Sequence, residues 1–144
     1  VLGLLVADPR TRLSAVDVLG ADERRRVLVD WNDTAADLGT VLVPELFAAQ
    51  VGRTPDAAAV VADGESVSYA ELDARASHLA QYLVGQGVGA ESVVGLCLPR
   101  GIDTVVAILA TWKAGAGYLP IDPEYPAERI GFMLADSGAA LTLT

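Results

Sequence analysis

The amino-acid sequence predicts an α/β protein with a mostly parallel sheet and flanking helices, preceded by an extended linker. From residue 92 onward, short apolar runs alternate with amphipathic segments of about ten residues, which is typical of parallel strands joined by right-handed helical crossovers. The first forty residues lack this alternation and carry only one short helical stripe. They are therefore predicted to be a linker.

The linker is predicted to contain one helix that begins near Asp22. Acidic side chains stand at its start and arginines 24–26 follow, an order that suits the helix dipole. The short polar side chains of residues 32–34 compete for backbone hydrogen bonds and are expected to end it. Its apolar stripe consists of Val27, Leu28 and Trp31.

A helix and a pair of strands open the globular part. The helix is expected over residues 43–50, and the strands over 57–62 and 65–67. Asp63-Gly64 stands between the two apolar runs, and this dipeptide favours the tight turn of a β-hairpin.

The strongest local signal is a helix start at residues 68–71. Ser68 and Glu71 have the spacing of a capping box, in which the hydroxyl and the carboxylate each accept a hydrogen bond from a free backbone N–H. The helix is expected to end near Gly85. Its predicted apolar face consists of Leu72, Ala76, Leu79 and Leu83.

The remaining elements alternate between strand and helix. Asp103 is expected to cap the first of the two helices, which then ends near Gly115. Pro126 suits the first turn of the second helix, which is expected to run through Leu134 and to be closed by residues 136–138. Strands are predicted over residues 92–98, 118–121 and 139–144.

Composition excludes several classes of protein. The 144 residues include 19 acidic and 10 basic side chains, a formal charge of −9, which disfavours binding of nucleic acid through a basic face. The single Cys97 rules out an internal disulfide and a thiol cluster for zinc, which predicts a reducing, cytoplasmic location. No apolar run reaches the ~18 residues of a membrane span, so no membrane partner is expected.

The glycine-rich segment at residues 85–89 resembles a phosphate loop only superficially. It follows a predicted helix and precedes a predicted strand. A nucleotide-binding loop has the reverse order, because its backbone amides must lead into a helix N-terminus. The segment is therefore interpreted as a helix-to-strand turn.

Individual residues with reactive side chains have plainer structural interpretations. Lys113, the only lysine, could be a catalytic amine, but a cap interaction with the end of its own helix is favoured. Asp122 and Glu124 are interpreted as exposed turn acids rather than paired carboxylates. His78 lies off the apolar face of its helix, and Cys97 lies in an apolar strand. The sequence thus predicts no catalytic, cofactor-binding or metal-binding residue.

Several segments together resemble the nonribosomal peptide synthetase family. Residues 31–34 (WNDT), 43–47 (VPELF) and 53–57 (RTPDA) are similar to the linker entering an amino-acid adenylation domain. Residues 67–72 (VSYAEL) resemble the first core motif of that domain. Residues 112–122 (WKAGAGYLPID) resemble its second motif, and residues 123–130 continue in the family manner.

The resemblance implies a domain organisation and a fold. Residues 1–37 would be the end of a condensation domain and the inter-domain linker. Residues 38–144 would be the truncated N-terminal part of an adenylation domain, that is, an incomplete portion of the large adenylate-forming subdomain. In the family, the phosphate loop, amino-acid pocket, adenine-binding segment and catalytic lysine all follow the second motif. Lys113 would then not be the catalytic lysine, and this fragment would be inert and bind no cofactor.

The resemblance also implies an activity and partners for the parent protein. A complete domain would activate an amino acid with ATP and Mg²⁺ as an aminoacyl adenylate, and load it on the phosphopantetheine thiol of a carrier domain. Partners would be the rest of the adenylation domain, an upstream condensation domain, a downstream carrier domain and a possible small accessory protein. Two alternatives stay open: a fragment of a free-standing acyl- or aryl-CoA ligase, or a small non-enzymatic α/β interaction domain.

Overall fold

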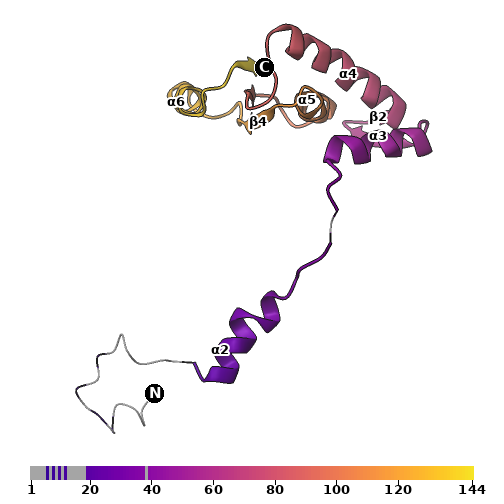
Figure 1. The fold of residues 1–144 in the computed structure, drawn as a ribbon. Coiled ribbons are helices and arrows are strands. Elements are labelled where there is room, and N and C mark those ends of the chain that lie inside the picture. The colour runs from indigo at the N-terminus through magenta and orange to yellow at the C-terminus, as the bar shows by residue number, and fades with distance from the viewer. Residues whose placement is uncertain (1–5, 7, 9, 11, 13–18, 38) are drawn as a thin grey trace. The chain divides into compact units, whose positions relative to one another are not determined.

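The computed structural model describes residues 6, 8, 10, 12, 19–37 and 39–144 (Figure 1). They divide into two units, one ending at Gly39 and the other beginning at Thr40. Most of the region before residue 19, which the resemblance assigns to a condensation domain, lies outside the described residues.

The first unit contains the predicted linker helix, α2 (Ala21–Leu28), followed by a single 3₁₀ turn, η2 (Asp30–Asn32). The side-chain amide of Asn32 donates to the carbonyl oxygen of Val27 at 2.8 Å, which closes the last turn. The expected helix and its polar end are therefore both present, although the α-helix gives way to a 3₁₀ helix at Val29.

The second unit is α/β, as predicted. A two-stranded antiparallel hairpin, β1–β2, accompanies a three-stranded parallel sheet with the strand order β4-β3-β5. Asp63 and Gly64 join the hairpin strands with positive φ angles of 52° and 81°, the geometry of the tight turn expected from this dipeptide. The elements in chain order are α3 (Val43–Arg53), β1 (Ala58–Ala62), β2 (Glu65–Ser68), α4 (Tyr69–Gly85), β3 (Val93–Leu96), α5 (Ile102–Lys113), β4 (Gly117–Pro120), α6 (Ala127–Ser137) and β5 (Leu141–Leu143).

Helices α4 and α5 contribute to both hydrophobic clusters of this unit. One cluster joins them to the hairpin and contains Val67, Leu72, Ala76, Ile102, Val106 and Leu109. The other joins them to the parallel sheet and contains Ala80, Leu83, Val88, Val94, Leu96, Ala107, Ala110, Ala114 and Ala116. Leu79, from the predicted apolar face of α4, is half-buried and packs against both clusters.

The central strand β3 separates helices α5 and α6. Val94 and Leu96 are buried in the cluster that includes α5. Gly95, between them, faces the other way, because a Cβ atom there would lie 2.8 Å from Cδ2 of Leu134 in α6. Strands β4 and β5 lie on opposite sides of β3. Because the β3–α5–β4 and β4–α6–β5 crossovers have the same handedness, helices α5 and α6 lie on opposite faces of the sheet.

Some element boundaries differ from the sequence prediction. Asp103 is not the cap of α5: Gly101 occupies the N-cap, and Asp103 lies within the first turn. Strands β3 and β5 are shorter than expected: β3 pairs with β4 over Val93–Leu96, and β5 pairs with β3 only over Val94–Leu96. Helix α6 continues past Leu134 to Ser137 and ends at Gly138, which adopts a left-handed conformation.

Replacement of Gly95 by alanine tests the packing of α6 on the sheet. Gly95→Ala should lower the free energy of unfolding by about 1 to 3 kcal/mol, because the added methyl group overlaps Leu134. Gly117→Ala is the matched control, since the nearest atom to its Cβ is the Ser92 oxygen at 3.9 Å. Chemical denaturation measures both, and equal effects of the two variants would contradict the packing described.

Candidate functional site

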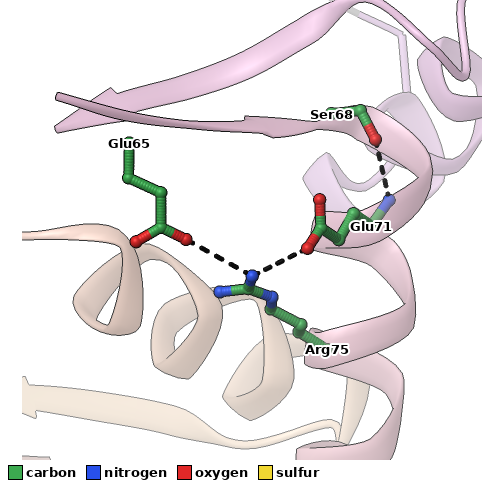
Figure 2. Close-up of polar contacts among 4 residues, drawn as sticks. All are labelled: Glu65, Ser68, Glu71 and Arg75. Carbon is green, nitrogen blue, oxygen red and sulfur yellow. Dashed lines mark hydrogen bonds and ion pairs between the residues drawn. The ribbon is translucent and has the colours of Figure 1, made fainter.

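The first motif forms the start of helix α4 (Figure 2). The Ser68 hydroxyl accepts a hydrogen bond from the Glu71 backbone N–H at 3.2 Å, as the capping box predicts. The two preceding amides, of Tyr69 and Ala70, donate to backbone carbonyls before β1 at 3.0 and 2.9 Å. Three amides that a helix leaves unpaired are thus satisfied.

The second half of the predicted capping box is wrong. The Glu71 carboxylate accepts a hydrogen bond from Arg75, one turn later, at 2.7 Å instead of returning to the helix start. Arg75 also reaches Glu65 of β2 at 3.4 Å, so one guanidinium links the hairpin to α4 (Figure 2). The hydrogen bond to Glu71 raises the pKa of Arg75 above its ordinary value, an effect that partial desolvation opposes. Arg75 therefore stays charged at every pH at which proteins usually fold.

Lys113, at the end of α5, makes a contact that its sequence neighbourhood does not reveal. Its Nζ donates to Oδ1 of Asp73 at 2.8 Å and to the Ser77 hydroxyl at 3.0 Å, both on helix α4. The Lys113 and Asp73 side chains are only 21% and 31% exposed. The ammonium thus joins α5 to α4 through residues 40 positions apart in sequence. The one available signal was the i, i+4 spacing of Asp73 and Ser77, which places both on one helix face.

The rest of the second motif turns α5 into strand β4. Gly115 adopts a positive φ of 81°, which reverses the chain, and the Ala116 N–H then donates to the Thr111 carbonyl at 3.0 Å. The N–H groups of Gly117 and Ile121 donate to carbonyls of the β3 segment, each at 2.9 Å. The motif therefore sets the register of β4 against β3.

A cleft of about 670 Å³ lies beyond the ends of β3 and β4. In doubly wound sheets, ligands bind where the strand order reverses, which for the order β4-β3-β5 is between β3 and β5 rather than here. The walls of the 670 Å³ cleft are formed by apolar side chains, including Leu96, Leu98, Ile108, Tyr118 and Ile121. The residues at its rim include Arg100, Asp122, Glu124 and Tyr125.

These residues do not fit a nucleoside triphosphate with magnesium. The rim offers one guanidinium against two carboxylates, and the Asp122 carboxylate already accepts a hydrogen bond from the Glu124 N–H at 2.9 Å, as a turn acid does. Within the described residues, no group of three or more acidic, His or Cys side chains could hold a metal ion. The glycine-rich segment at 85–89 follows α4 and leads toward β3, so its amides do not open a helix.

The two remaining candidates, His78 and Cys97, are not among the residues that line this cleft. His78 is exposed on α4, and Cys97 is a half-buried thiol just past the end of β3. Neither side chain has a hydrogen-bond or ionic partner in the part of the chain that the structure describes. In the two motifs, the side chains of Ser68, Glu71 and Lys113 make contacts within this chain.

Comparison with known proteins agrees with the resemblance seen in the two motifs. A family model described as AMP-binding enzyme matches residues 47–144. The chain belongs to the AMP-binding enzyme family. Relatives include chondramide synthase cmdD of Chondromyces crocatus, 47% identical over all of this chain, and gramicidin S synthase 2 of Brevibacillus brevis, 44% identical over all of it. The dimodular nonribosomal peptide synthase of Bacillus subtilis is 42% identical over 96% of the chain.

The chain spans only a small part of these AMP-binding relatives: 4%, 3% and 6% of their respective lengths. Among solved structures, the N-terminal subdomain of NpsA from Klebsiella oxytoca superposes with a TM-score of 0.66 and 28% identity, over 71% of this chain and 27% of that one. The same subdomain in complex with anthranilyl-AMSN gives a TM-score of 0.64 at 30% identity, over 67% and 26%. Within the described residues, no helix has the length and apolarity to cross a membrane.

A double-mutant cycle tests the ion pair between α4 and α5. Lys113→Met and Asp73→Ala, alone and combined, should show a coupling of about 1 to 2 kcal/mol in the free energy of unfolding, because the pair is largely shielded from water. Arg75→Gln is the comparison, since its more exposed ion pairs should contribute less and weaken in high salt. A coupling near zero for Lys113 and Asp73 would contradict the assigned role.

Proposed function

We propose that this chain is the N-terminal part of an amino-acid adenylation domain within a nonribosomal peptide synthetase module. The observation that carries the proposal is the 42–47% identity to synthetases of this kind over 96–100% of the chain. The aligned region includes the segment before residue 47, where the AMP-binding match begins. A free-standing acyl- or aryl-CoA ligase has no need of such a linker, which makes that alternative less favourable.

The parent protein would use ATP and Mg²⁺ to convert an amino acid into an aminoacyl adenylate, and would load it on the phosphopantetheine thiol of a carrier domain. Its partners would be the rest of the adenylation domain, the neighbouring condensation and carrier domains and, in some systems, a small accessory protein. We propose that the parent protein catalyses this reaction in the cytoplasm.

The proposed domain boundary lies after residue 37. Residues 1–37 would end the condensation domain and form the linker, and residues 38–144 would begin the adenylation domain. The division of the described chain after Gly39 and the start of the family match at residue 47 both support this boundary.

The contribution of this chain to the activity would be structural. The first motif starts α4, and the second ends α5 and sets β4 in register. The side chains of Ser68 and Glu71 in the first motif and of Lys113 in the second make contacts within the chain. We therefore assign no catalytic, cofactor-binding or metal-binding residue to it.

Amino-acid-dependent ATP–pyrophosphate exchange tests the proposal. The 144-residue chain alone should show no exchange with any proteinogenic amino acid, because its residues do not fit the nucleotide. The complete domain that contains it should exchange with one or a few amino acids. Exchange by the chain alone would disprove its structural role, and absence of exchange by the complete domain would disprove the adenylation assignment.

A further inference from the structure

The end of the linker helix carries a group of large apolar side chains that are open to water. Leu28, the last residue of α2, is 55% exposed, Val29 is 59% exposed, and Trp31 in η2 is 69% exposed. All residues of α2 and η2 are described, and none of them is buried. A single exposed apolar side chain is ordinary, but three so close together, one of them a tryptophan, are typical of a contact site. We call these three residues the linker patch.

The backbone that presents Trp31 is held by hydrogen bonds on both sides of it. The Asn32 side-chain amide donates to the Val27 carbonyl at 2.8 Å, and the Asn32 N–H donates to the Val29 carbonyl at 3.0 Å. The Thr34 N–H then donates to the Asn32 carbonyl at 2.8 Å. A partner that binds the indole therefore loses little free energy in ordering the turn. Tryptophans in such preorganised positions are common among the residues that dominate binding energy.

Helix α2 needs a partner for its own stability. It has eight residues, whereas isolated helices shorter than about 12 residues are marginal in water. The ion pair between Arg25 and Asp30 is 3.5 Å long and exposed, so it contributes little. Most helices in proteins are stabilised by packing of their apolar face. We therefore expect α2 to be firmly helical only where the linker patch is covered.

Two findings indicate the kind of protein that covers it. The AMP-binding match begins at residue 47 and the second unit begins at Thr40, so the linker patch lies outside both. Chondramide synthase cmdD and gramicidin S synthase 2 are nevertheless 47% and 44% identical to all of this chain, the linker patch included. The covering surface is therefore expected in the part of such synthetases that is not the AMP-binding fold.

We propose that the linker patch packs on the condensation domain that precedes the adenylation domain, with Trp31 as the buried anchor. Residues 1–37 are assigned above to the end of that domain and the linker, so α2 follows it directly in the chain. The patch has no charged side chain, which fits an apolar recess on the partner. This inference rests on the proposed function.

Photo-cross-linking in the complete module identifies the partner. Trp31 is replaced by p-benzoylphenylalanine, and the cross-linked peptides are identified by mass spectrometry. They should come from the condensation domain. Tyr82 on α4, an aromatic residue that is 58% exposed, is the matched control and should give at least about 10-fold less cross-linking to that domain, because it lies outside the linker patch. Cross-links from position 31 confined to the adenylation or carrier domain, or equal yields from both positions, would overturn the proposal.

Amide hydrogen exchange in the same module tests the stabilising role of the anchor. Trp31→Gln should speed exchange of the α2 amides by at least about 10-fold, because the helix loses its main contact. Tyr82→Gln should leave these amides unchanged. Amides of α2 that exchange equally fast with and without Trp31 would contradict the anchor.

ATP–pyrophosphate exchange by these module proteins separates the inference from the proposed function. It should be unchanged by Trp31→Gln, since the linker patch lies outside the AMP-binding match. A module without exchange activity that still cross-links from position 31 to the condensation domain would support the docking and contradict the adenylation assignment. An active module without that cross-link would disprove the docking alone.

Discussion

The packing of helix α4 against helix α5 is the contact on which the rest of the globular unit depends. Small buried residues, such as Ala76 and Ala80 on α4 and Ala107 and Ala110 on α5, allow the two helices to approach closely. The same pair joins the hairpin through one hydrophobic cluster and the parallel sheet through the other. Without this pair, the hairpin and the sheet would share no core.

The first sequence motif forms the start of α4, and the second forms the end of α5. In the first motif, the Ser68 hydroxyl satisfies the Glu71 amide at the start of α4, and Arg75 joins that helix to β2. The second ends α5 at Gly115 and places Lys113 against Asp73. Residue types that elsewhere carry chemistry are used here to fix orientation.

Local signals were sufficient to predict most of the fold. The turn at Asp63-Gly64, the start of α4 at Ser68 and the alternation of strands and helices follow from the short-range preferences of the backbone. Contacts between distant residues were not predictable. The partner of Lys113 lies 40 residues away, and Arg75 contacts Glu65 of β2, ten residues away on another element. The resemblance implies that the reactive parts of the family lie beyond this chain, and the residues of the cleft beyond β3 and β4 do not fit a nucleoside triphosphate.

The central claim is that Lys113 orients a helix and takes no part in the chemistry. It is tested most directly by the turnover of the complete adenylation domain carrying Lys113→Met, measured by ATP–pyrophosphate exchange well below its melting temperature. The account predicts a kcat and an amino-acid KM close to those of the unmodified domain, together with a lower melting temperature. A loss of kcat of about 100-fold or more at an unchanged melting temperature would contradict it, since general acid–base catalysis alone is worth that much.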